Sequence, residues 1–265
     1  MQTMKASNNS YSIEYLSCRL IVLSCALILE GCAHSYYLPN NQNVPLLTEK
    51  NEFHGSISMG GSPVLSGLDV QAALALTNHL AIMTNYMSSK YPEDFDDKNQ
   101  ANGKYLEVAG GYFNRFNRFY VFEVYGGFGS CMQNHEYYDA MNNNTYLGKS
   151  DLTFSKVFLQ PSIGVTFNAF DIALTSGFSR INIKKFNYSV DQNSRYFDEL
   201  DLISKNRTSF LFEPGITIRG GWKFIKLQFQ YIRSINLSTN ALNFEPAKYS
   251  FGIYISASKK YLNDK

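Results

Sequence analysis

The sequence predicts an all-β protein: a ten-stranded antiparallel up-and-down transmembrane β-barrel with short periplasmic turns and long outer loops. Three observations predict it. Aromatic residues make up 15% of the 265 residues, with 19 Tyr, 20 Phe and one Trp, which favours strands over helices. From residue 53 onward, apolar and polar side chains alternate in ten short runs. Short and long connections between the runs also alternate, as they do in barrels of bacterial outer membranes.

Composition excludes several classes of protein. The chain is 45% hydrophobic and 17% charged, which is too apolar for disorder and too charged for a stack of membrane helices. A net charge of +2 gives no basic field for nucleic acid, and no Walker or dinucleotide-binding motif is present. The spacing of the four cysteines resembles no metal site, so we expect no bound metal. From the charge and the missing motifs we also expect no cofactor and no nucleic-acid partner.

Residues 1–31 are predicted to be a signal peptide that is removed. Arg19 precedes an apolar run at 20–29, which is too short to span a bilayer as a helix. The following Leu29-Glu30-Gly31-Cys32 resembles the lipobox of bacterial lipoproteins, which implies that Cys32 is lipidated and begins the mature chain. Glu30 departs from that pattern, so ordinary cleavage and a buried thiol stay open as alternatives.

Residues 32–52 are predicted to form the lipidated cysteine and a periplasmic tether. This segment is polar, contains Pro39 and Pro45, and has no sustained periodicity. The residues directly after Cys32 lack the early acidic cluster that resembles a surface-export signal in some Bacteroidota lipoproteins. We therefore expect a periplasmic, lipid-anchored N-terminus, followed by an outer-membrane barrel at 53–265.

The ten runs of period two are expected at residues 53–61, 66–76, 79–90, 103–115, 119–130, 153–166, 169–181, 207–219, 222–234 and 248–258. Very short turns follow the even-numbered runs. Longer connections are expected at 91–102, 131–152, 182–206 and 235–247, whereas the first, at 62–65, is short. No helix is expected. Pro161 and Pro214 fall inside runs and predict a bulge or a local break, because proline removes a ladder hydrogen bond.

The composition of the two faces indicates which one is inside. In the run 222–234, Ile225 and Leu227 alternate with Lys226 and Gln228. A water-facing surface should be about a quarter to a third charged, but the polar faces of these runs are mostly small residues with few charges. We therefore expect the apolar face to contact lipid and the polar face to line a lumen, with a soluble lipocalin-like barrel as the alternative.

The few charges on the polar faces predict an ionic network inside the lumen, because buried charges must pair. Its members are Asp69, Glu107, Glu123, Lys156, Asp171, Glu213, Arg219 and Lys226. Aromatic residues near strand ends predict interfacial girdles; these are Tyr86, Tyr112, Phe167, Phe170 and Trp222.

About 230 residues of the chain resemble the uncharacterised outer-membrane β-barrel proteins of Bacteroidota. The resemblance is carried by Cys32, the segment 40–46, Asp69-Val70-Gln71-Ala72, Leu80-Ala81-Ile82-Met83 and the two proline-containing runs. It implies a fold and a compartment, the bacterial outer membrane, but no activity.

The expected function is a structural or surface-interaction role without enzymatic activity, with the lumen occluded. Eight strands enclose a barrel filled by side chains and wide channels need about sixteen, so ten lie near the closed end. A narrow channel using the luminal carboxylates is one alternative. A surface hydrolase at the outer mouth, with His135, Glu136 and Asp139 in a long loop, is another. Expected partners are outer-membrane lipid, the barrel-assembly machinery, and an extracellular glycan or protein at the outer loops.

Overall fold

The computed structural model describes residues 35–62, 65–91, 99–139, 142–238 and 243–258. The predicted signal peptide at 1–31 and the predicted lipidation at Cys32 lie outside this part of the chain. The strands are β1 (Phe53–Gly61), β2 (Ser66–Ala75), β3 (Leu80–Lys90), β4 (Gln100–Arg115), β5 (Tyr120–Asp139), β6 (Thr145–Thr166), β7 (Phe170–Val190), β8 (Thr208–Gly221), β9 (Ile225–Arg233), β10 (Ile235–Asn236) and β11 (Ala247–Ala257).

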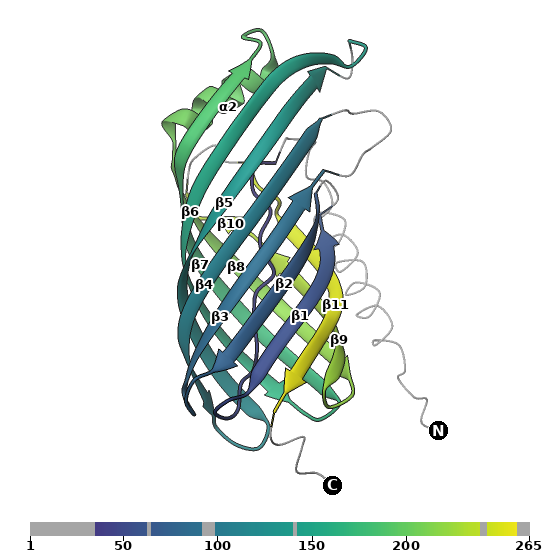
Figure 1. Ribbon diagram of the computed structural model, residues 1–265. Coiled ribbons are helices and arrows are strands. Elements are labelled where there is room, and N and C mark those ends of the chain that lie inside the picture. Colours follow the sequence, from purple (N-terminus) through teal and green to yellow (C-terminus); the bar gives the residue numbers. More distant parts are fainter. Residues whose placement is uncertain (1–34, 63–64, 92–98, 140–141, 239–242, 259–265) are drawn as a thin grey trace, which may run out of the picture. The chain divides into compact units, whose positions relative to one another are not determined.

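The strands form one closed antiparallel barrel (Figure 1). Strands β1 to β8 pair in sequence order, β8 pairs with β9, β9 with β11, and β11 with β1. The two-residue β10 pairs with β8 beyond the point where β9 leaves it, so ten strands make the wall. The predicted fold class is confirmed. We call the end with the tight turns after β2, β4, β6 and β8 the short-turn end, and the opposite end the long-loop end.

The barrel is apolar outside and polar inside. On β9, Leu227 is 70% exposed, whereas the neighbouring Lys226 is 2% exposed. Apolar side chains are exposed on all ten wall strands, and the inward positions include many buried polar and charged residues beside three apolar clusters. A water-soluble barrel would place these side chains the other way round, so the outer face is built for lipid.

The apolar outer surface, which we call the lipid band, ends abruptly toward the long-loop end. On β7 the last apolar outward residue is Phe178 and the next outward one is Arg180. Arg180 pairs with Val157 of β6, and the next two outward residues of β6 toward the long-loop end, Ser155 and Thr153, are polar. On β4 the change falls between Leu106 and Lys104. Near the strand ends, the predicted girdle residues Tyr86, Tyr112, Phe167, Phe170 and Trp222 are all exposed.

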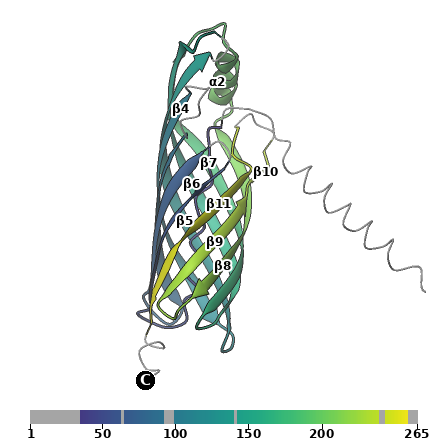
Figure 2. The ribbon, with the colours of Figure 1, turned by 90° about the vertical axis from the view of Figure 1, so that its right-hand side faces the viewer.

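One side of the wall is much taller than the other (Figures 1 and 2). Strands β5, β6 and β7 have 20, 22 and 21 residues, against 9 to 11 in β1, β2, β3, β9 and β11. The predicted long loop at 131–152 is therefore mostly strand. The prediction was wrong because outward residues beyond the lipid band become polar, which weakens the alternation on which it depended.

The connection between β7 and β8 contains a helix that the sequence analysis did not predict, α2 (Arg195–Lys205). Tyr196, Leu200 and Ile203 recur at helical spacing and are buried, and Asp198 and Lys205 suit the two ends of the helix dipole. A search for period two cannot detect this spacing. Among the described residues no helix is long and apolar enough to cross a membrane.

Both strand prolines interrupt the ladder on one side. Pro161 pairs with Val124 of β5, but the pairing of β6 with β7 skips positions 160 and 161. Pro214 pairs with Ser176 of β7, and the β8 partner on the other side changes next to it, from β10 to β9. The local breaks expected from the missing N–H groups are therefore present.

Residues 35–47, which we call the luminal segment, run through the inside of the barrel and are buried (purple in Figure 1). The prediction of a tether is wrong for this part of 32–52. Its polar composition suits an interior lined by polar groups as well as it suits water, and the sequence pattern does not distinguish the two. The lumen of this ten-stranded barrel is thus occupied by the luminal segment.

Candidate functional site: the closed lumen

The luminal segment enters at the long-loop end. The Ser35 N–H donates to the Tyr91 hydroxyl (3.2 Å), and the Tyr36 N–H donates to the Asn243 carbonyl (3.0 Å). At the other end, the Lys50 N–H just beyond the segment donates to Asn78 Oδ1 in the turn after β2 (3.2 Å). The segment therefore crosses the whole lumen before β1 begins.

Side chains of the wall bind the backbone of the luminal segment. Gln230 accepts from the Gln42 N–H (2.8 Å) and donates to its carbonyl (2.9 Å). Three further wall side chains donate to backbone carbonyls of the segment: Gln71 donates to Asn41 (2.8 Å), Gln160 to Asn43 (2.7 Å) and Arg219 to Val44 (2.6 Å). An extended segment has no ladder partner for its backbone groups, and buried ones must be satisfied. The luminal glutamines and Arg219 provide that satisfaction.

The lower half of the segment is apolar and fills the short-turn end. Val44 and Leu46 pack with Val121 and Ala173, and Leu47 packs into a second cluster of buried apolar residues. The Leu47 N–H donates to Glu123 Oε1 (2.9 Å). Close packing of this kind leaves little room for water to pass.

The structure places all eight predicted network residues in the interior, each at most 8% exposed. It brings three of them together. Lys156 Nζ lies 3.2 Å from Glu107 and 3.3 Å from Glu213, and the Tyr37 hydroxyl donates to Glu213 (2.8 Å). Lys156 also donates to that hydroxyl (3.1 Å). Tyr37 of the luminal segment is thereby hydrogen-bonded to charged residues on β6 and β8, and Lys156 connects them to Glu107 on β4.

The other network residues form separate contacts. Lys226 pairs with Asp171 (2.8 Å), and Asp69 pairs with Lys248 (2.8 Å). Arg219 has no acidic partner in ion-pair contact among the described residues; its guanidinium lies 3.9 Å from the centre of the Tyr254 ring. The sequence analysis did not include Lys248 in the network, because Lys248 is the first residue of the run 248–258. Ser250 and Tyr254 on the same strand point inward, so the alternation of side chains places Lys248 inside as well.

Helix α2 covers the long-loop mouth. The rings of Tyr196 and Tyr137 lie 4.7 Å apart, and Leu200 and Ile203 are fully buried in the cluster that contains Tyr36. The Tyr36 hydroxyl donates to Glu199 (3.3 Å). Burial raises the pKa of the Glu199 carboxyl above its ordinary value. Both ends of the luminal segment are thus anchored.

His135 does not lie in a loop, as the hydrolase alternative required. It is an inward residue of β5, 2% exposed, with its ring 5.2 Å from the Tyr36 ring. Glu136 is exposed on the opposite face, because consecutive strand residues point to opposite sides. Asp139 is at the end of the strand. The structure does not bring these three residues together.

A second histidine lies beside a serine and a carboxylate at the short-turn end. His54 Nε2 contacts both Ser256 Oγ (2.9 Å) and Glu52 Oε1 (3.0 Å). In a catalytic triad the nucleophile and the carboxylate bind different ring nitrogens, so that one nitrogen is free to take the nucleophile's proton. Here Nδ1 faces the Pro45 carbonyl and the Tyr254 hydroxyl instead. This buried cluster holds the luminal segment in place and lacks the geometry of a triad.

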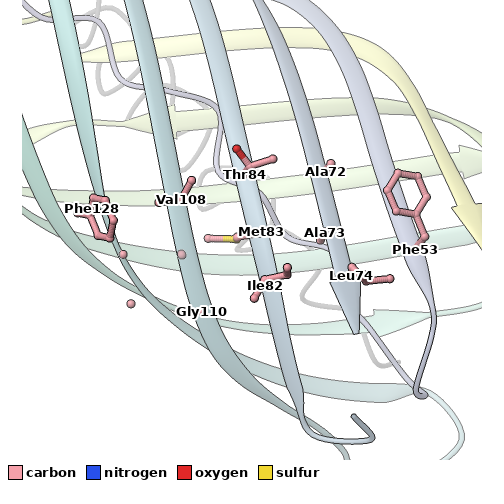
Figure 3. Close-up of a pocket in the computed structure, with 13 residues that line it drawn as sticks. Phe53, Ala72, Ala73, Leu74, Ile82, Met83, Thr84, Val108, Gly110 and Phe128 are labelled. Carbon is pink, nitrogen blue, oxygen red and sulfur yellow. The ribbon is translucent and has the colours of Figure 1, made fainter. Parts of the chain in front are cut away.

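One pocket is a groove of about 510 Å³ on the outer face of β1 to β5 (Figure 3). Small residues form its floor, among them Ala72 and Gly110, and the exposed Phe53, Ile82 and Phe128 stand around it. None of its lining residues is titratable. Within the described ranges, no group of three or more His, Cys, Asp or Glu residues could hold a metal ion.

No protein-family model and no curated protein matches the chain. Solved structures are similar in fold. They include the KdgM porin, with a TM-score of 0.37 and 13% identity over 77% of this chain and 99% of the porin. The translocator domain of autotransporter NalP from Neisseria meningitidis has a TM-score of 0.47 and 9% identity over 93% of this chain and 96% of that domain. A third, LpxR from Salmonella typhimurium, has a TM-score of 0.37 and 9% identity over 76% of this chain and 99% of LpxR. At these identities the likeness concerns the fold alone.

Proposed function

We propose that the chain is an outer-membrane barrel closed by its own luminal segment, with a structural or surface-interaction role and no enzymatic activity. One observation carries the proposal: residues 35–47 fill the lumen and are held there by the side chains that line it. A barrel closed in this way offers partners its long-loop end, where the tops of β5 to β7 and α2 extend beyond the lipid band. A glycan or protein would bind there. Lipid surrounds the barrel, and the barrel-assembly machinery inserts it.

We further propose that the short turns face the periplasm, as in other outer-membrane barrels. Ser35 is then at the outer mouth. The three residues from Cys32 to Ser35 span roughly 10 Å when extended, less than the roughly 25 Å height of an outer-membrane apolar band. The mature N-terminus, with any lipid on Cys32, is accordingly proposed to lie on the cell surface. This replaces the periplasmic N-terminus expected from the sequence.

Epitope insertion tests this arrangement. A peptide epitope inserted directly before Ser35 is expected to bind antibody on intact cells. The same epitope in the short turn at Asn168 should bind only after the outer membrane is permeabilised, and one in the loop at Asn193 should bind on intact cells and confirm surface access. Labelling of the first insertion only after permeabilisation would refute a surface N-terminus. Labelling of the Asn168 insertion on intact cells would refute the orientation of the barrel.

The absence of enzymatic activity is tested by incubating the refolded protein with peptides and with phospholipids. We expect no hydrolysis above that of a heat-unfolded control, because His135 and His54 are buried and Ser256 and Glu52 contact the same ring nitrogen of His54. Turnover that disappears in His135→Ala or His54→Ala, while the variant still migrates as a folded barrel, would overturn this part of the proposal.

A further inference from the structure

A basic patch covers the outer wall of β7 just beyond the lipid band. Its members, Arg180, Lys184 and Lys185, are all exposed. Two consecutive lysines are exposed because Lys184 is an extra residue in the ladder: Ile183 pairs with Phe154, and Lys185 pairs with Thr153. Within the described ranges, no carboxylate is in ion-pair contact with any of the three. Their charges are available to a ligand.

An apolar groove of about 310 Å³ lies directly next to this patch, inside the lipid band. Exposed apolar side chains from β6, β7, β8 and the residue after β10 line it: Val157, Leu159, Phe178, Phe210 and Leu237. Arg180 also lines the groove, and its guanidinium lies 5.8 Å from the centre of the Phe210 ring. The groove and the patch therefore share a boundary residue at the edge of the lipid band.

We propose that the groove and the patch together bind a membrane lipid with a phosphorylated headgroup. Arginine presents paired N–H donors that match phosphate oxygens, and the two lysines add point charges. An acyl chain would lie in the groove, against Phe178 and Leu159. The order of the two surfaces, charged beyond the band and apolar within it, is the order of headgroup and acyl chain in a bilayer.

A second copy of the chain fits this surface less well. A twofold interface brings the same patch of both copies together, so the three cations of each copy would face those of the other. Like charges across an interface repel. A phosphorylated lipid supplies the opposite charge at the required height.

Native mass spectrometry of the refolded chain in a neutral detergent tests the proposal with three probes. Dioleoyl phosphatidic acid carries both phosphate and acyl chains, dioleoylglycerol carries the chains alone, and inorganic phosphate carries the charge alone. The wild type is expected to bind phosphatidic acid and to prefer it to both other probes. The triple variant Arg180→Gln, Lys184→Gln, Lys185→Gln is expected to bind it about a hundredfold more weakly, at roughly fivefold per basic residue.

Two further variants separate charge from groove. Val157→Trp narrows the groove without changing any charge and should also weaken binding of phosphatidic acid. Lys90→Gln with Lys104→Gln removes two exposed cations from β3 and β4, away from the groove, and should leave binding unchanged. The proposal would be overturned if the wild type and the triple variant bound phosphatidic acid equally well. It would also be overturned if the wild type bound dioleoylglycerol as well as phosphatidic acid. Full displacement of the lipid by inorganic phosphate would show a site for free phosphate instead. None of these results depends on the surface location of Ser35.

Discussion

Replacing residues 35–47 with a glycine and serine segment of equal length is expected to convert a silent barrel into an ion-conducting pore. The replacement removes the Tyr37 hydroxyl, which hydrogen-bonds to both Lys156 and Glu213, and it removes Val44, Leu46 and Leu47 from the short-turn end. What remains is a lumen whose polar and charged wall side chains have lost their partners on the segment, and water can fill the space that the segment occupied. In planar bilayers we expect discrete current steps from the variant and none from the wild type at equal protein load.

A control variant with the same type of replacement at 192–194, in the loop before α2, should stay silent. The luminal charges predict a further effect on the open pore. Glu213→Gln in the pore-forming background removes one acidic group and should shift ion selectivity toward anions. A replaced barrel that shows the heat-modifiable migration of a folded protein, yet conducts nothing, would mean that the wall side chains close the lumen without the luminal segment.

The alternation of side chains was sufficient to predict the part of the barrel inside the lipid band. The run expected at 53–61 coincides with β1, and the run at 169–181 begins within one residue of β7. The latter prediction ended nine residues too early, at the point where Arg180 begins the polar outer wall. Lipid imposes the alternation, and beyond the bilayer both faces of a strand can be polar. The alternation therefore predicts which part of each strand lies within the lipid band, and it does not predict where the strand ends.

The luminal segment could not be predicted from periodicity, because a single extended chain inside a barrel contacts wall on every side and has no solvent face. One signal was nevertheless present. The inward positions include Gln71, Gln160 and Gln230, and the wall alone satisfies only part of their hydrogen-bonding capacity. Buried amides indicate a second set of backbone groups to be satisfied. A comparison of the hydrogen-bond donors and acceptors at inward positions with the partners that the wall itself provides would have indicated an occupant of the lumen.

Removing Lys156 is expected to cause the largest loss of stability of any single substitution in the wall. Lys156→Met leaves Glu107 and Glu213 facing the same interior space without the ammonium group that lies between them. Breaking a buried ion pair by deleting one partner costs about 3–5 kcal/mol. Urea unfolding in detergent, followed by the fluorescence of the sole tryptophan, Trp222, should show a fall of that size in the free energy of unfolding.

Two comparisons identify the cause of that loss. The triple variant Lys156→Met, Glu107→Gln, Glu213→Gln removes the opposing charges as well and should recover most of it, because neutral amides can hydrogen-bond to Tyr37 without a counter-charge. Lys205→Met deletes the lysine of an exposed pair with Asp201 (2.6 Å) and should change the free energy of unfolding far less, because water and salt screen exposed ion pairs. If Lys156→Met unfolds no more easily than Lys205→Met, the interior around Tyr37 must be hydrated enough to solvate two carboxylates. A lumen that wet would also conduct, so the stability and conductance measurements constrain each other.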